Sequence, residues 1–244
     1  MKYSIKYWLL LALLFSLKGF SQEVPKGFEL MEIVKISETY RLASDISFDM
    51  SITYADSTQP NTILEQLQGQ YKIHNGKYWG TLDSIEYLQG SMYNLAVYRS
   101  DSMITVSNRQ EYSKVLQIPL MDSLFRDANI ADIQVTRVND STRSLKIIFN
   151  PESVYHSYEI QYDLNSFLIR NVKYYLTGAD RSGDVSSSSG VDCVNIFFSN
   201  YSDEVVGEEY FNEGKFIYNQ GGQLLPQSAF AGFKVMISGT NQNQ

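Results

Sequence analysis

The sequence is poor in the residues that build metal centres and disulfide frameworks. Its 244 residues include one cysteine and two histidines. This excludes a disulfide framework within the chain and any cysteine-rich zinc or iron–sulfur site, and it leaves little room for a histidine-rich metal centre. Basic residues are also few, because 20 Lys and Arg stand against 27 Asp and Glu, for a formal net charge of −7. That balance argues against nucleic acid as a partner, since proteins that bind nucleic acid carry basic patches.

The start of the chain carries the one long apolar run of the sequence. Lys2 and Lys6 precede the apolar stretch Trp8–Leu17, and small residues lead up to Gln22. This layout is typical of a secretory signal peptide, whereas a membrane-spanning anchor needs about 20 apolar residues. The sequence therefore predicts a signal peptide over residues 1–21.

The rest of the chain is then read as an exported protein. Residues 22–244 suit one β-rich domain, which we expect in the periplasm, with secretion as the alternative. Removing the leader takes away three lysines and no acid, so the formal net charge changes from −7 to −10. No later stretch resembles a transmembrane helix. Cys193, in a strand-like run, is expected to be a buried and inert thiol.

Apolar and polar residues alternate along much of the mature chain. The clearest case is Asp45–Tyr54, whose pattern predicts a strand with one buried and one solvent-exposed face. A second strand ends at Asn75-Gly76, the strongest hairpin signal in the chain. Helices are expected at Pro25–Leu42 and near Pro119–Asp127, each with a proline in its first turn.

About ten strands in hairpin order, with two helices, predict a mainly β fold of the α+β class. We expect a large curved antiparallel sheet, or half-barrel, with one or two helices on its concave face. Two short helices cover such a sheet incompletely, so an apolar concavity is predicted. The residues expected to line it alternate along the first strand or share one face of the mid-chain helix: Ile46, Phe48, Met50, Ile52, Tyr54, Leu120, Leu124 and Phe125.

The sequence lacks the short motifs of common catalytic sites, including the nucleophile elbow, the phosphate-binding loop and the H-E-x-x-H metal motif. His74 stands beside the Asn75-Gly76 turn and is interpreted as a solvated residue. Asp203-Glu204 and Glu208-Glu209 could serve a carboxylate-based hydrolase, but they are interpreted as an exposed, solvated loop. We therefore expect no enzyme, no catalytic or metal-binding residues and no cofactor.

The order of the predicted elements resembles the LolA-like and LolB-like half-barrels, the lipoprotein carriers of the bacterial envelope. The resemblance is architectural and covers most of the mature chain. The features that carry it are the leader ending Gly19-Phe-Ser-Gln22, the helix Pro25–Leu42, the strand Asp45–Tyr54, the hairpin at Asn75-Gly76 and the helix near Pro119–Asp127. The leader ending and the Tyr-, Asn- and Ser-rich composition also resemble exported proteins of the Bacteroidetes.

In that family a curved antiparallel sheet wraps helices and encloses an apolar cavity for acyl chains. The resemblance implies that this chain binds or carries a hydrophobic ligand, or the acyl chains of a lipoprotein, without covalent chemistry. The alternative is a non-catalytic scaffold or interaction subunit of a cell-envelope complex, with envelope proteins as partners.

Overall fold

The computed structural model describes residues 28–109, 130–153, 155–176 and 193–238. The predicted signal peptide and the helix predicted near Pro119–Asp127, with Leu120, Leu124 and Phe125, lie outside these ranges. Within them, no helix is both long enough and apolar enough to cross a membrane.

In these ranges one α-helix, α2 (Glu29–Arg41), precedes a series of strands and lies inside the range predicted as helical. Three short 3₁₀ helices follow later: η2 (Glu208–Phe211), η3 (Glu213–Lys215) and η4 (Ser228–Phe230). The strands are β1 (Asp45–Ala55), β2 (Ile63–His74), β3 (Lys77–Leu82), β4 (Ile85–Gln89), β5 (Tyr93–Tyr98), β6 (Met103–Asn108), β7 (Ile130–Arg137), β8 (Thr142–Phe149), β9 (Tyr155–Asp163), β10 (Ile169–Leu176), β11 (Cys193–Ser202), β12 (Ile217–Gln220), β13 (Gln223–Pro226) and β14 (Lys234–Ile237).

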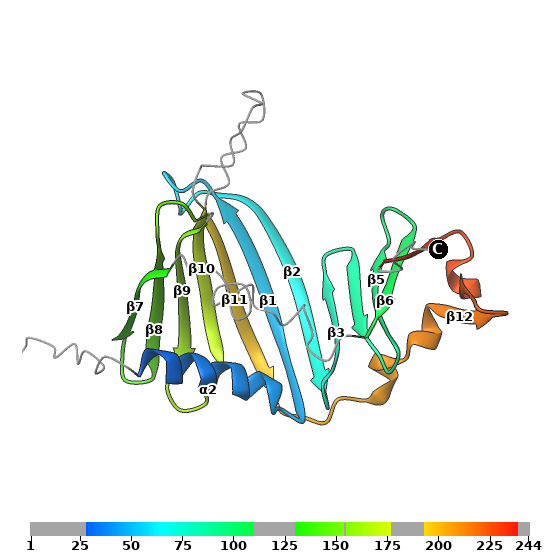
Figure 1. The fold of residues 1–244 in the computed structure, drawn as a ribbon, viewed down its shortest axis with the longest axis horizontal. Helices are drawn as coiled ribbons and strands as arrows, with labels where there is room; N and C mark the ends of the chain where they lie inside the picture. Colours follow the sequence, from blue (N-terminus) through cyan, green and yellow to red (C-terminus); the bar gives the residue numbers. More distant parts are fainter. Residues whose placement is uncertain (1–27, 110–129, 154, 177–192, 239–244) are drawn as a thin grey trace, which may run out of the picture.

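Twelve of the described strands form one sheet, in the order β14-β6-β5-β4-β3-β2-β1-β11-β10-β9-β8-β7. Strands β1–β6 and β7–β11 are two antiparallel meanders that meet where β1 pairs with β11. Figure 1 shows α2 lying across one end of the second meander and of β1. The predicted mainly β class, large antiparallel sheet and helix on one face are thus confirmed. The parallel pairing of β14 with β6 was not predicted, because a hairpin pattern yields antiparallel neighbours only.

The hairpin predicted at Asn75-Gly76 is confirmed between β2 and β3. Asn75 and Gly76 have φ angles of 47° and 74°, as a tight turn with two left-handed residues requires. The turn fixes a register in which Tyr71 pairs with Gly80. A Cβ atom on Gly80 would lie 2.7 Å from the Tyr71 ring, so this glycine leaves room for the ring to lie over β3.

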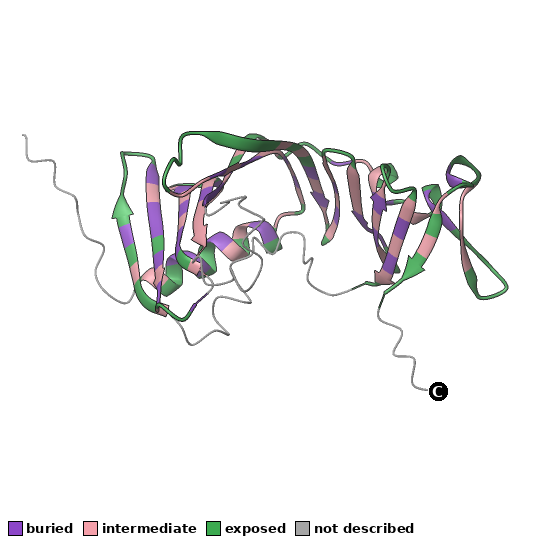
Figure 2. Ribbon diagram, turned by 90° about the horizontal axis from the view of Figure 1, so that it is seen from above, coloured by how far each residue is buried: buried purple, intermediate pink, exposed green. Residues whose placement is uncertain are grey.

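We call the sheet face that α2 packs against the helix face, and the opposite one the outer face. Figure 2 shows the sheet curving round α2. A helix of 13 residues is about 20 Å long, and neighbouring strands lie about 4.8 Å apart. Because α2 can therefore cover only about four strands, most of a twelve-stranded sheet needs other cover. On β1, β2 and β7–β11 most of the buried apolar side chains lie on the helix face and form one core with α2.

On β3–β6 the principal apolar cluster changes to the outer face. One row of paired residues crosses these strands on that face: Trp79, Leu88, Leu95 and Val106. We call residues 203–233, between β11 and β14, the C-terminal block. Its buried side chains Phe211, Phe216 and Phe230 form a second core with this row. One sheet therefore carries two cores on opposite faces.

Candidate functional site

The five β1 residues predicted to line a concavity all lie on the helix face. Ile46, Phe48 and Ile52 are buried in the core that α2 shares with the sheet, and Met50 and Tyr54 are half-buried against it. The structure brings all five to one face. Their contact with a ligand stays a prediction.

The core is densely aromatic where α2 crosses β1. The Phe48 ring stacks on Tyr71, with 5.6 Å between the ring centroids. It also lies 6.2 Å from the ring of Tyr40 on α2, and 5.6 Å and 5.3 Å from the rings of Phe198 and Tyr201 on β11. Protein side chains therefore fill this end of the helix face, which leaves the opposite end of the strands as the candidate site.

A ring of three hydrogen bonds fixes the C-terminal end of α2 to the sheet. The backbone N–H of Ile169 donates to Tyr40 Oη at 2.9 Å, and Tyr201 Oη donates to the carbonyl oxygen of Ile169 at 2.7 Å. The two tyrosine hydroxyls lie 2.6 Å apart. Burial raises the pKa of Tyr40 to about 12. The backbone N–H and carbonyl groups of Ile169, at the start of β10, thus bond to one side chain from α2 and one from β11.

A buried carboxylate fixes the first turn of α2 to the sheet. Glu32 Oε2 accepts a hydrogen bond from Tyr162 Oη at 2.6 Å and lies 3.0 Å from Arg143 Nη1. Burial alone would raise the pKa of Glu32, but the hydrogen bonds of Tyr162 and Arg143 outweigh it and hold the pKa below its usual value. The carboxylate therefore stays charged and paired beneath the helix, as a buried charge must.

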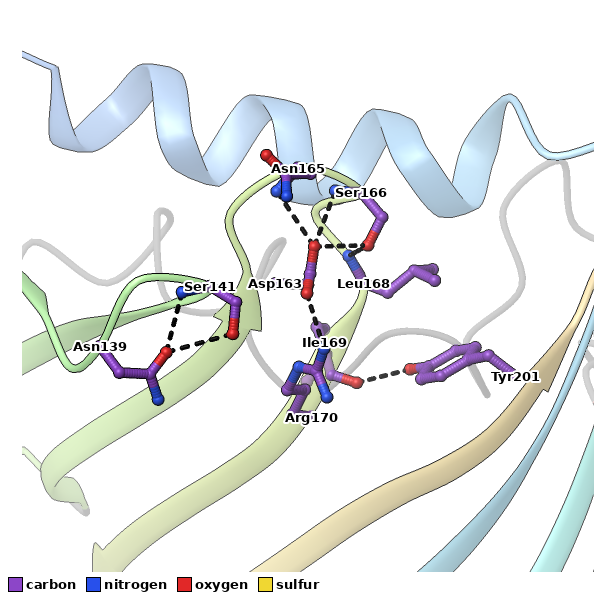
Figure 3. A network of polar contacts seen from close by, with 9 residues as sticks. All are labelled: Asn139, Ser141, Asp163, Asn165, Ser166, Leu168, Ile169, Arg170 and Tyr201. Carbon is purple, nitrogen blue, oxygen red and sulfur yellow. Dashed lines mark hydrogen bonds and ion pairs between the residues drawn. The ribbon is translucent and has the colours of Figure 1, made fainter.

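The β9–β10 turn, which contacts α2, is organised by Asp163 (Figure 3). Its Oδ2 lies 2.6 Å from Arg170 Nη2, and its Oδ1 accepts hydrogen bonds from two backbone N–H groups of the turn at 3.0 and 3.1 Å. Arg170, followed by the N–H of Ser166, lowers the pKa of Asp163 to about 2. Beside the turn, Lys35 Nζ of α2 lies 5.0 Å from the centroid of the Phe167 ring.

Tyrosines gather on the helix face at the end of the sheet away from α2. The ring of Tyr158 stacks on Tyr174, with centroids 5.6 Å apart, and Tyr155 meets Tyr174 edge-on at 6.0 Å. In the register of the strands, Tyr54, Val194, Tyr174 and Tyr158 follow one another across β1, β11, β10 and β9. Burial, followed by the nearby Tyr54 and Tyr155, raises the pKa of Tyr174 to about 12. We call Tyr54, Tyr155, Tyr158 and Tyr174 the tyrosine row.

The prediction that His74 is a solvated turn residue is wrong. Its side chain is 15% exposed, because the β1–β2 register places it opposite Asp45. His74 Nδ1 lies 2.7 Å from Asp45 Oδ1, which also accepts a hydrogen bond from the N–H of Val206 at 2.8 Å. The Val206 N–H, followed by His74, lowers the pKa of Asp45. Around His74 Nε2 lie the Asn75 side-chain amide at 2.9 Å and Glu208 Oε1 at 3.4 Å. The pair anchors the C-terminal block to β1.

The acidic residues predicted to lie in an exposed, solvated loop are exposed in the structure: Asp203, Glu204, Glu208 and Glu209. Lys77, Glu208 and Glu213 help to line a pocket of about 380 Å³ between the block and the sheet. Glu208 Oε2 lies 2.6 Å from Lys77 Nζ, and the Lys77 hydrogen bond lowers the pKa of Glu208, whereas a catalytic acid needs a raised pKa. Glu213 Oε1 accepts hydrogen bonds from the N–H groups of Met92 and Tyr93 at 2.7 and 2.8 Å. These carboxylates hold the block in place.

A scan against protein-family models and a search of curated proteins both give no match. Solved structures of similar fold include an uncharacterized conserved protein from Thermus thermophilus, with 6% identity over 85% of this chain and 98% of the other, at a TM-score of 0.47. The lipoprotein LppX from Mycobacterium tuberculosis has 12% identity over 75% of this chain and 99% of its own, at a TM-score of 0.40. A LolA superfamily protein from Nitrosomonas europaea has 10% identity over 76% of this chain and 98% of its own, at a TM-score of 0.35.

At such identities the likeness concerns the fold alone. The chain itself has the open antiparallel sheet and the helix across one face that the resemblance to LolA-like half-barrels led us to expect. The resemblance to exported Bacteroidetes proteins stays a prediction.

Proposed function

We propose that this is an exported envelope protein that binds or carries a lipid or an acylated cargo on the helix face of its sheet, without catalysis. In this proposal residues 1–21 direct export to the periplasm, and residues 22–244 form a single binding domain. The cargo is a hydrophobic ligand or the acyl chains of a lipoprotein.

The observation that carries the proposal is the run of partly exposed apolar side chains on the helix face beyond α2. The helix contacts one end of the strands, through Glu32 and Tyr40. Toward the other end, and onto β3 and β4, half-buried side chains continue on the same face: Met50, Tyr54, Leu67, Leu82, Tyr87, Tyr155 and Tyr174. Covering such area releases about 25 cal/mol per Å², or about 0.8 kcal/mol per CH₂ group of a bound chain.

The outer face of the same strands is mainly polar, with the exposed Phe197 as an apolar member of an otherwise polar row. The row across β2, β1, β11, β10 and β9 reads Gln68, Ser51, Phe197, Asn171 and Gln161. Gln68 Nε2 donates to Ser51 Oγ at 3.1 Å, so the polar groups of this face are partly tied to one another. An acyl chain would leave such groups without water, which costs free energy. The two faces therefore differ in the way that a one-sided lipid site requires.

Two neighbouring residues on β1 allow a matched test. Met50 and Ser51 are both half-buried and point to opposite faces. We expect a pyrene-labelled monoacylglycerol to bind the unmodified protein saturably, Met50→Lys to weaken binding at least about tenfold, and Ser51→Lys to leave it within about twofold. Equal effects of the two variants, or no saturable binding by the unmodified protein, would contradict the proposal.

The exposed side of α2 favours a second candidate, a scaffold or interaction subunit of an envelope complex. Five large apolar side chains on and beside this helix are between 47% and 66% exposed: Phe28, Leu30, Met31, Val34 and Leu42. Exposed apolar patches of this kind often mark protein interfaces. If α2 binds an envelope protein, Val34→Glu abolishes the crosslinking of this chain to that protein in native envelope extracts. Unchanged crosslinks, or none with the unmodified protein, would argue against this candidate.

A further inference from the structure

Two buried tyrosine hydroxyls at the α2 end of the helix face have hydrogen-bond partners, whereas among the described residues one at the far end has none. Tyr40 belongs to the ring of hydrogen bonds at Ile169, and Tyr162 donates to Glu32. Tyr158 is 1% exposed. Its Oη has no hydrogen-bond partner among the residues that the structure describes. An unpaired hydroxyl in a protein interior costs free energy, and native structures contain few of them.

Tyr158 lies within the tyrosine row and away from the helix. It precedes Tyr162 by four residues on β9, a distance of about 13 Å along the strand. Its pairing partners on the two neighbouring strands are Tyr174 and Ile147. Burial, followed by Tyr174 and Tyr155, raises the pKa of Tyr158 well above its usual value. The hydroxyl therefore keeps its proton and can act as a hydrogen-bond donor.

The chemistry of this position restricts what could pair with it. A saturated hydrocarbon has no acceptor to offer. A free carboxylate would have to lose its hydration among aromatic and aliphatic side chains, which is costly unless a cation pairs with it. The carbonyl oxygen of an ester or amide accepts a hydrogen bond without carrying a charge, and it stands at the head of an acyl chain.

We propose that Tyr158 Oη donates a hydrogen bond to the ester or amide carbonyl of a bound acyl group. This site would then select acylated molecules over plain hydrocarbons and free fatty acids. The inference rests on the proposed function, because it takes the tyrosine row as part of the ligand site. A free glycerolipid and the acylated N-terminus of a lipoprotein both present such a carbonyl.

The test compares 1-palmitoylglycerol with 1-O-hexadecylglycerol, which has the same head and chain length but no carbonyl. By displacement of the pyrene probe, we expect the ester to bind about fivefold more tightly than the ether. Tyr158→Phe reduces this ratio to about one. Tyr218→Phe, at a 41% exposed tyrosine of the C-terminal block, keeps the ratio of the unmodified protein. An ester-to-ether affinity ratio near one in the unmodified protein, or a ratio that Tyr158→Phe leaves unchanged, would overturn the inference. Because both ligands still bind in these outcomes, the proposed function would stand. Absence of any displacement would refute the proposed function instead.

Two further measurements complete the test. An N-palmitoylated peptide amide also loses about fivefold in affinity on Tyr158→Phe, and whichever carbonyl ligand binds more tightly identifies the source of the cargo. In thermal unfolding without ligand, Tyr158→Phe leaves the melting temperature unchanged or raises it, because it removes an unpaired polar group. A clear fall in the melting temperature would show that the hydroxyl already has a partner, and would contradict the inference.

Discussion

At the scale of single residues, charged groups at the α2 end of the sheet are individually paired. Glu32 is paired with Tyr162 and Arg143, and Asp163 with Arg170 and the turn backbone. The alternation of side chains along a strand was enough to place Tyr158 and Tyr162 on one face of β9. It could not tell which of the two would meet a helix carboxylate, because Glu32 lies 130 residues away in the sequence.

Asp163 gives a prediction about pH. Its pKa is lowered to about 2 in the folded protein and is about 4 in an unfolded chain. The ionised form is therefore favoured by folding, so its stabilisation is present above pH 4 and is lost as the pH falls toward 2. With solvent screening we expect about 1 kcal/mol. In urea unfolding, the free-energy difference between the unmodified protein and Asp163→Asn should shrink over this range. A difference independent of pH would contradict the assignment.

At the scale of elements, β1 and the hairpin at Asn75-Gly76 follow from alternation and turn chemistry, which act over short sequence distances. The position of α2 over the ends of the strands does not follow from such local patterns, because it depends on contacts of Tyr40 and Tyr201 with Ile169. The same limitation explains His74. Its neighbour Asn75-Gly76 indicated a turn, but its partner Asp45 is brought to it by strand register.

Gly80 tests how tightly the β2–β3 hairpin is packed. Gly80→Ala places a methyl group against the Tyr71 ring, with an expected cost of about 1–3 kcal/mol. Gly232→Ala is the control, because a Cβ atom there meets no atom within 4 Å. Thermal unfolding should show a lower melting temperature for the first variant only. Equal melting temperatures would mean that Tyr71 can move aside freely.

At the scale of the whole molecule, the described part of the chain has two cores on one sheet, and α2 contributes to only one of them. The sequence predicted the incomplete cover on the helix face. It did not predict that β3–β6 bury their main apolar cluster on the outer face, under residues 203–233. Aromatic residues in that segment were visible in the sequence, but alternation alone does not say which face of a strand is covered.

Asp45 tests the attachment of the C-terminal block. Asp45→Ala removes the acceptor of the Val206 N–H and the partner of His74. We expect faster hydrogen exchange and faster proteolytic cleavage in residues 203–216. Asp49→Ala is the control, since Asp49 lies on the same face of β1 and bonds to Asn200 and Gln70 outside the block. Cleavage at the same rate in both variants would show that the block is held without this contact.

The central claim is that an acyl chain lies on the helix face of the sheet. Photo-crosslinking with a monoacylglycerol that carries a diazirine in its chain, followed by mapping of the labelled residues, tests it most directly. We predict label on Met50, Tyr54, Leu67 and Tyr174, reduced by excess 1-palmitoylglycerol. Label that resists competition, or that falls on outer-face residues such as Ser51 and Gln68 or on the C-terminal block, would contradict the account.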